Sequence, residues 1–378
     1  MRSGFPTTRV LLAGCLVLLL AIAVNSILLA SAAYARAHGP ARADDAVSVS
    51  LFGLFHARKF VVTAPAGHAL ILHADEQSVV LENSGVSSAT VRIDGSDLVV
   101  SAGRQELRST KVAVAGRGNE PADFILEIPS KIRRQYHGTL EIKPASGNLL
   151  SVVTLDLETA VASVVDAESA PDTPIEALKA QAIAARSYFV AGRGRHRDFD
   201  FCDTTHCQFL RAAPPATSRV AVAVVATRGL VLDYQSMPFA AMYTRSCSGQ
   251  TRTPAQVGLP AAPYPYFSAD CEYCRRHPVR WTSHIPAHQA ESLRASDETA
   301  RLAVVRRIGW SAVPSNDFSF AKDGDRVLLR GVGNGHGIGL CQAGARAMAE
   351  SGAGFREILL HYYPNTDIVR HSAANRPE

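Results

Sequence analysis

The sequence has no dense run of lysine or arginine, although its 39 basic residues exceed its 34 acidic ones and give a net charge of +5. This mildly basic balance suits an anionic surface such as a cell wall, a membrane or a nucleic acid. Without clustered charge the signal for nucleic acid is weak, and we expect no nucleic-acid partner. Charged residues are also scarce at 19%, against 47% hydrophobic residues, so the composition argues against global disorder and allows a substantial core.

Cysteine is absent between Cys15 and position 202, so the first third of the mature chain needs no covalent cross-link. Six cysteines follow, and an even number in an exported chain permits disulfides. These are Cys202, Cys207, Cys247, Cys271, Cys274 and Cys341.

The N-terminus is predicted to carry an export signal. Arg2 and Arg9 precede a long apolar run over residues 10–33, and small residues that fit a cleavage site follow it. The run is long for a cleaved signal, so residues 1–37 are predicted to be either a signal peptide or a membrane anchor. The body of the protein is therefore expected in the periplasm, in the cell wall or on the outer face of the membrane. Only the N-terminal segment is expected to meet the membrane.

Residues 46–154 are predicted to form a β-rich accessory domain. Short runs rich in valine, isoleucine and leucine, such as "KFVVTA" and "HALILHA", alternate with clusters of glycine, asparagine, aspartate and proline. That spacing is typical of a sandwich or barrel-like sheet. Nothing in this half suggests catalysis, and we interpret it as a binding or positioning module.

Helical and strand patterns are mixed over residues 155–366, so the fold class is predicted to be α+β, with a short tail over 367–378. The clearest helix starts near Ile175, where Thr173, Pro174 and Glu176 suggest an N-cap, a first helical residue and a capping box. Further helices are predicted over about 338–350 and from 355 to Pro364. The runs over 220–234 and 238–246 favour strands.

Three segments occur in order within this half: "ESAPDTPIEALKAQAIAARSYFV", "HRDFDFCDTTHCQFL" and "GNGHGIGLCQAGARAMAESGAGFREILLHYYPNT". Together with "YTRSCSGQT", they resemble the SpoIID/LytB family, which includes a peptidoglycan lytic transglycosylase of sporulation and proteins described as amidase enhancers. The resemblance covers about residues 155–366. It implies a mixed helix and strand catalytic domain that acts on peptidoglycan glycan strands, with a cell-wall amidase as a further partner.

The resemblance implies cleavage of the bond between N-acetylmuramic acid and N-acetylglucosamine. The C6 hydroxyl of the muramic acid attacks in place of water and leaves a 1,6-anhydro end. One carboxyl group can serve this reaction, first as an acid on the leaving oxygen and then as a base on the hydroxyl. Hydrolytic glycosidases commonly need a second carboxylate, which is dispensable here. No cofactor is needed for the catalysis.

Glu168 and Glu176 compete for the acid/base role. The family places a catalytic glutamate shortly before a proline ahead of the "EALKAQA" helix, and Glu168 occupies that position with one extra residue before Pro171. Glu176 already has a structural role in the predicted capping box. We therefore favour Glu168, with Asp166 third, and expect burial to raise the pKa of the catalytic carboxyl.

Substrate contacts are expected from Tyr188, His336 and Gln342. The glycines around His336 allow close approach of the backbone to a ligand, and the following helix can present N–H groups to a sugar. His336 could instead fix a tight turn, and Tyr188 could belong to the core.

The segment around "FDFCDTTHCQF" offers donors for a metal ion. His196, Cys202, His206 and Cys207 supply the side-chain types of a structural zinc site, although neighbouring His206 and Cys207 need a turn to reach one ion. A Cys202–Cys207 disulfide and free thiols remain the alternatives. The "CEYC" pair at Cys271 and Cys274 is a second possible half-site or disulfide source, with Cys247 or Cys341.

Two other functions remain open. A cysteine-dependent hydrolase would pair Cys207 or Cys341 with His336, but it leaves the glutamate and helix motif unexplained. A non-catalytic, wall-binding amidase enhancer becomes the better interpretation if Glu168 does not lie in a cleft.

Overall fold

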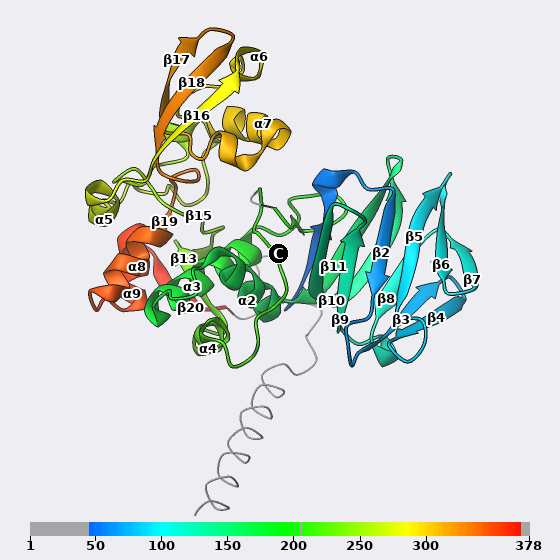
Figure 1. The fold of residues 1–378 in the computed structure, drawn as a ribbon. Coiled ribbons are helices and arrows are strands. Elements are labelled where there is room, and N and C mark those ends of the chain that lie inside the picture. Colours follow the sequence, from blue (N-terminus) through cyan, green and yellow to red (C-terminus); the bar gives the residue numbers. More distant parts are fainter. Residues whose placement is uncertain (1–44, 205, 372–378) are drawn as a thin grey trace, which may run out of the picture. The chain divides into compact units, whose positions relative to one another are not determined.

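The computed structural model describes residues 45–204 and 206–371, and the residues from Ala46 onward group into a single compact unit (Figure 1). The predicted leader over residues 1–37 and the end of the predicted tail lie outside the described residues. Within the described ranges, no helix has both the length and the apolar character needed to cross a membrane. The α+β class with a β-rich N-terminal region is confirmed.

The β-rich part contributes eleven strands to a twelve-stranded sheet. Buried positions alternate with more accessible ones along most of them, as in β3, because one face of each strand packs into the core. The strands are β1 (Ala46–Leu51), β2 (Lys59–Thr63), β3 (Ala69–Ala74), β4 (Gln77–Glu82), β5 (Ser88–Asp94), β6 (Asp97–Ala102), β7 (Gln105–Ser109), β8 (Val112–Ala115), β9 (Ala122–Ile128), β10 (Ile132–Ala145) and β11 (Asn148–Asp156).

The long strand β10 joins two halves of this sheet. Residues 132–138 pair with β9, whereas residues 139–145 pair with β11. Gly138 stands at the change of partner, with φ at 146°. A Cβ atom there would come within 2.5 Å of the carbonyl oxygen of Thr154, so the close approach of the two backbones requires glycine.

The chain returns to this sheet beyond the predicted domain boundary. The boundary at residue 154 falls inside β11, and the short strand β12 (Phe201–Cys202) adds to the sheet edge in parallel with β1. Asp203 strengthens this return, because its buried carboxylate accepts hydrogen bonds from the Phe52 N–H at 3.2 Å and the Tyr136 hydroxyl at 3.4 Å. The "FDFCDTTHCQF" segment is therefore packed against β1. The division at residue 154 stays a prediction.

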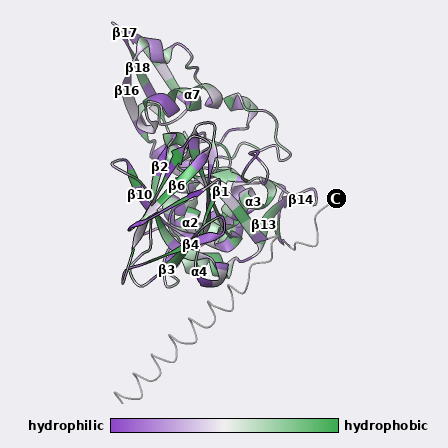
Figure 2. Ribbon diagram, turned by 90° about the vertical axis from the view of Figure 1, so that its right-hand side faces the viewer, coloured by the Kyte–Doolittle hydropathy of each residue, from purple (hydrophilic) through white to green (hydrophobic). Residues whose placement is uncertain are grey.

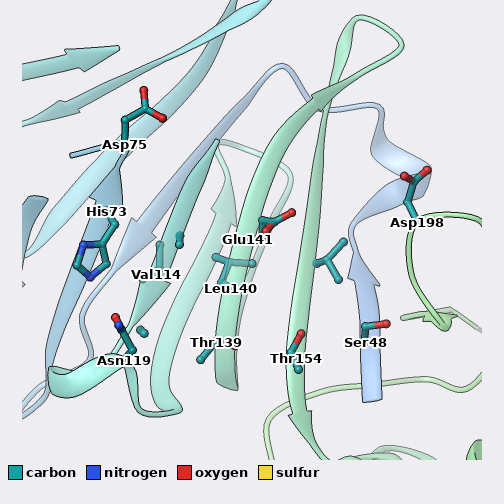
Figure 3. Close-up of a pocket in the computed structure, with 13 residues that line it drawn as sticks. Ser48, His73, Asp75, Val114, Asn119, Thr139, Leu140, Glu141, Thr154 and Asp198 are labelled. Atoms are coloured by element: carbon teal, nitrogen blue, oxygen red, sulfur yellow. The ribbon is translucent and has the colours of Figure 1, made fainter. Parts of the chain in front are cut away.

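A groove of about 590 Å³ crosses the sheet over β1, β3, β8, β10 and β11. Figure 3 shows Asp75 and Asp198 toward opposite sides of it, with Glu141 between them. The lining includes none of the residues predicted to act on substrate.

Helices α2 (Leu157–Glu168), α3 (Ile175–Ala191) and α4 (Arg219–Ala226) follow the sheet in sequence. Strand β13 (Leu230–Tyr234) lies beside α3 (Figure 2). Helix α3 confirms the prediction of a helix there. Helix α2 was not predicted, and α4 replaces the first part of the predicted strand over 220–234. The Ser218 hydroxyl accepts a hydrogen bond from the Ala221 N–H and starts α4, and packing against α2 and α3 overrides the strand preference of its valines.

Short strands complete the core around α3. Strand β13 pairs with β14 (Met237–Pro238) and with β20 (Asp367–Arg370), which lies in the predicted tail. Strand β15 (Tyr243–Thr244) pairs in parallel with β19 (Leu340–Cys341). Helix α8 (Gln342–Glu350) therefore begins four residues later than predicted, and α9 (Phe355–Tyr362) lies where a helix was expected.

Residues 280–332 form a small layer that the sequence did not predict. Strands β16 (Arg280–Pro286), β18 (Arg326–Val332) and β17 (Phe318–Asp323) pair antiparallel in that order. Helices α6 (Ala287–Ala290) and α7 (Glu298–Ile308) connect β16 to β17. Val304 and Val305 of α7 are buried in a separate apolar core that belongs to this layer. Helix α5 (Glu272–Arg276) precedes this layer.

Candidate active site

Glu168 is the last residue of α2, where the helix ends and the chain turns toward α3. Helix α2 is anchored by the Asp156 carboxylate, which accepts hydrogen bonds from the Glu158 and Thr159 N–H groups. Sequence analysis placed Glu168 ahead of the predicted helix at Ile175 and predicted no earlier helix. Its position at the end of a buried helix instead fixes its backbone and leaves its side chain half-buried.

Burial raises the pKa of the Glu168 carboxyl, since an ionised carboxylate loses hydration there. Three groups oppose this effect: the positive charge of Arg245, a hydrogen bond from the Phe209 N–H, and the positive charge of Arg211. The pKa remains above its ordinary value. A carboxyl group in this setting keeps its proton to higher pH than an exposed glutamate and is still stabilised as an anion after it donates that proton.

Glu176 lies in a different environment. One carboxylate oxygen pairs with the Lys179 ammonium at 2.7 Å, and the other accepts a hydrogen bond from the Phe355 N–H at 2.9 Å. Both contacts lower the pKa of Glu176, the Lys179 hydrogen bond most. The predicted capping box is wrong, because α3 starts after Pro174 without a side-chain cap and the Thr173 hydroxyl donates to the Ala170 carbonyl. Glu176 instead holds the N-terminus of α9.

The loop between α2 and α3 is fastened to α8. Arg346 makes a bidentate ion pair with Asp172, at 2.8 and 2.6 Å, and also contacts Glu350 at 2.8 Å. Asp166, the third candidate for acid/base, is exposed on the last turn of α2, although burial still raises its pKa somewhat against the effect of Arg211. Glu168 is thus the best enclosed carboxyl of the three.

Gln342 is brought to Glu168 across 174 residues of sequence. As the first residue of α8, it points its side-chain Nε2 at the backbone carbonyl of Glu168, 3.4 Å away. The β15–β19 pair lies immediately before Gln342 and carries Arg245 just past its end. These elements form one wall beside the Glu168 carboxyl.

The His336 ring is held by hydrogen bonds to the backbone. Its Nδ1 accepts a hydrogen bond from the Ile338 N–H at 3.0 Å, and the ring also bonds the backbone carbonyl of Tyr243. Burial is the main cause that lowers the pKa of His336, so the ring is predominantly neutral at pH 7. In this structure His336 fixes the glycine-rich turn, and its contact with substrate stays a prediction.

Tyr188 is buried on α3, where its ring lies under the Arg195 guanidinium at 5.2 Å and its hydroxyl accepts a hydrogen bond from Arg195. The ring also packs against Phe201, with 6.0 Å between the ring centres. These contacts place Tyr188 in the core beside the "FDFCDTTHCQF" segment. Its role as a substrate contact is untested.

The four predicted metal donors converge. The donor atoms of His196, Cys202, His206 and Cys207 all lie within 4.8 Å of one another. His196 Nε2 is 3.4 Å from Cys207 Sγ, and the two sulfurs are 3.4 Å apart and unbonded. A turn brings neighbouring His206 and Cys207 to the same point, with His206 Nδ1 3.6 Å from each sulfur. The arrangement suits a tetrahedral ion with two nitrogen and two sulfur donors.

The structure does not bring together the cysteine and histidine that a cysteine-dependent hydrolase would need. Cys207 contacts His196, and Cys341 is buried among three other cysteines. The His336 ring meanwhile bonds to Ile338 and Tyr243. Among the described residues, no thiol and imidazole pair is therefore formed with His336.

Sequence analysis did not identify three neighbours of Glu168. Arg245 and Arg211 bring positive charge to its carboxyl, and Tyr243 is close enough that the Glu168 charge helps to raise the pKa of its hydroxyl, after burial. Tyr243 also donates a hydrogen bond to Gln208 Oε1 at 2.9 Å. The only signal was their position in or beside the matched motifs, "YTRSCSGQT" and the residues after "THCQF".

Comparison with known proteins matches residues 145–234 to the family model described as SpoIID, stage II sporulation protein. The chain is 28% identical over 274 residues to an uncharacterized protein of Brachyspira hyodysenteriae, covering 64% of this chain and 74% of that protein. It is 27% identical to stage II sporulation protein D of Bacillus subtilis, covering 59% of this chain and 77% of the relative.

An amidase enhancer of Bacillus subtilis is 23% identical over 52% of this chain, which spans only 38% of that relative. The family match includes Glu168, Glu176, Tyr188 and the His196–Cys207 cluster. The family model and these relatives confirm the resemblance to the SpoIID/LytB family that the motifs indicated.

Proposed function

We propose that this protein is an exported peptidoglycan lytic transglycosylase in which Glu168 is the general acid and base. The observation that carries the proposal is the half-buried Glu168 carboxyl, whose pKa is raised by burial, beside Arg245 and the Phe209 N–H. The relatives named for sporulation and for amidase enhancement support a cell-wall context. An apolar leader over residues 10–33 supports export.

In the proposed reaction, the protonated Glu168 carboxyl gives its proton to the glycosidic oxygen as the bond to C1 of muramic acid breaks. The resulting carboxylate takes the proton of the C6 hydroxyl, which closes the 1,6-anhydro ring. Arg245 and Arg211 stabilise the carboxylate between these steps. Both guanidinium groups belong to exposed residues, so they are also available to the lactyl carboxylate of muramic acid.

The direct test is incubation of the purified chain with glycan strands stripped of stem peptides, followed by mass spectrometry. Transglycosylation gives 1,6-anhydro ends, which are one water lighter than the reducing ends of hydrolysis. Reducing ends alone would contradict the proposal. If folded protein leaves the strands intact but accelerates a cell-wall amidase, the amidase-enhancer function is correct instead, in line with the relative of that name.

Arg245→Met is expected to move the alkaline limb of the pH–rate profile to higher pH. The Arg245 charge lowers the pKa of Glu168, so its removal raises that pKa, and the active, protonated form persists further into the alkaline range. The measurement is kcat/KM for anhydro-product release across pH. Arg108→Met, at an exposed arginine on β7, is the control and should leave the limb in place. An unmoved limb, or a shift to lower pH, would refute the placement of Arg245 beside the catalytic carboxyl.

We further propose that His196, Cys202, His206 and Cys207 hold a structural zinc ion. Zinc would cross-link the segment that packs against β1 and takes no part in the glycan chemistry, because the proposed reaction activates no water. His196→Ala and Cys207→Ser should each lower the zinc content by one ion per chain in elemental analysis. A Cys202–Cys207 disulfide in the zinc-free wild type would exclude this site.

A further inference from the structure

A second group of four cysteines is brought together from three separate segments. Cys247 lies in the turn after β15, Cys271 and Cys274 open α5, and Cys341 ends β19. The four sulfur atoms lie within 4.8 Å of one another, and Cys274 Sγ is 3.5 Å from Cys341 Sγ. All four residues are buried, at 2% exposed or less.

The spacing of these sulfurs fits one metal ion. Four thiolates around tetrahedral zinc, with metal–sulfur bonds of about 2.3 Å, stand about 3.8 Å apart. The sulfurs are unbonded to one another. Four thiols from three segments would otherwise have to meet in the core without a bond that holds them there, whereas a single ion satisfies all four at once.

The surroundings supply hydrogen bonds of the kind that support metal-bound thiolates. The Cys247 N–H donates to Cys341 Sγ at 3.4 Å, and the Tyr362 hydroxyl donates to Cys271 Sγ at 3.5 Å. Ser246 Oγ lies 3.5 Å from Cys274 Sγ, within hydrogen-bond distance.

Gly344, on the first turn of α8, keeps room for this arrangement. A Cβ atom at that position would come within 2.6 Å of Cys271 Sγ and would also collide with the Tyr362 hydroxyl. Helix α8 therefore approaches the sulfurs closely at Gly344, because glycine has no side chain. The cluster is built into the packing of α5, α8 and α9.

We propose that Cys247, Cys271, Cys274 and Cys341 bind one structural zinc ion. Binding releases the thiol protons and leaves four thiolates on the metal. The ion ties α5 to the ends of β15 and β19, whose register pairs Thr244 with Cys341.

This site supports the wall of the candidate active site from behind. Arg245 stands two residues before Cys247, and Gln342 follows Cys341 directly. These are the residues that approach Glu168 by charge and by hydrogen bond, respectively. The zinc ion would be a positioning element, since none of its ligands is a contact of the Glu168 carboxyl.

The test is zinc content per chain, measured by elemental mass spectrometry on protein purified without added zinc or reductant. The double variant Cys271→Ser/Cys274→Ser should hold one zinc ion fewer than wild type. His196→Ala in the same background should remove a further ion, because it affects the separate His196–Cys207 cluster. Equal zinc in wild type and in the double variant would overturn the proposal, as would iron in place of zinc.

Disulfides are distinguished by intact mass. Two disulfides among these four cysteines would make the wild-type chain four hydrogen atoms lighter and would also overturn the proposal. Should the double variant fail to fold, the wild type still decides the question. Cobalt(II) exchanged into it must give the absorption of a tetrahedral site with four sulfur donors, in addition to any signal of a mixed nitrogen and sulfur site. Absence of the four-sulfur spectrum counts against zinc binding here.

Zinc counting does not depend on glycan cleavage. A protein that binds zinc through these cysteines and yet fails to release anhydro ends would contradict the proposed function alone. A protein that cleaves glycan without this ion would contradict the metal site alone.

Discussion

Glu168→Gln is expected to lower the release of 1,6-anhydromuramic ends by at least about 100-fold, the lower range for loss of a general acid. The glutamine amide matches the carboxyl in size but can neither give a proton to the leaving oxygen nor accept one from the C6 hydroxyl. The side chain is half-buried, and among the residues that the structure describes no cation lies within ion-pair distance of its carboxylate, so the fold should tolerate the change. The measurement is mass spectrometry of digests of peptide-free glycan.

Glu176→Gln is the matched control. It removes the same charge eight residues along the chain, but from a carboxylate bound to Lys179 and the Phe355 N–H. Because this pair is partly exposed, we expect a loss of stability of about 1 kcal/mol or less and nearly unchanged cleavage. The reverse result, with cleavage lost in Glu176→Gln and kept in Glu168→Gln, would transfer the catalytic role to Glu176.

Glu158→Gln is expected to reduce the free energy of unfolding by about 3–5 kcal/mol. Arg186 is fully buried on α3, and its guanidinium donates to both carboxylate oxygens of Glu158, at 2.9 and 2.7 Å. It also donates to the Leu230 carbonyl at 3.0 Å, so the pair fixes β13 to α2 and α3. Removal of the negative charge leaves a cation in the core without its counter-ion. Urea unfolding followed by circular dichroism measures the loss.

Two further variants make this prediction specific. Glu158→Leu combined with Arg186→Met removes both charges and should be less destabilising than Glu158→Leu alone, because no unpaired ion remains. Asp94→Asn breaks the exposed pair with Arg108, 3.0 Å apart, and should cost about 1 kcal/mol or less. If Glu158→Gln were as mild as Asp94→Asn, the buried pair would not be a principal support of this core.

Local sequence patterns predicted those elements whose secondary structure follows from their own residues. The alternation in runs such as "HALILHA" gave β3, and the apolar repeat after Ile175 gave α3. The prediction was wrong at "RVAVAVVA". Its β-branched residues favour a strand by themselves, but the segment forms α4. Neighbouring helices decide that segment, because they bury Val220 and Val224 on one helical face.

The candidate site also combines features that local sequence predicts with features that only tertiary packing sets. The sequence by itself determined the β-rich half, the helices α3, α8 and α9, the family motifs and the close-spaced donors from His196 to Cys207, because each depends on residues near one another in the chain. Only the tertiary structure decided that Glu176 binds the Phe355 N–H, that Arg245 and Gln342 reach Glu168, and that Cys247 and Cys341 join the "CEYC" pair. These contacts are not local: Cys341 is 67 residues from Cys274, and Phe355 is 179 residues from Glu176. Chain packing alone sets such distances, and no local periodicity encodes them.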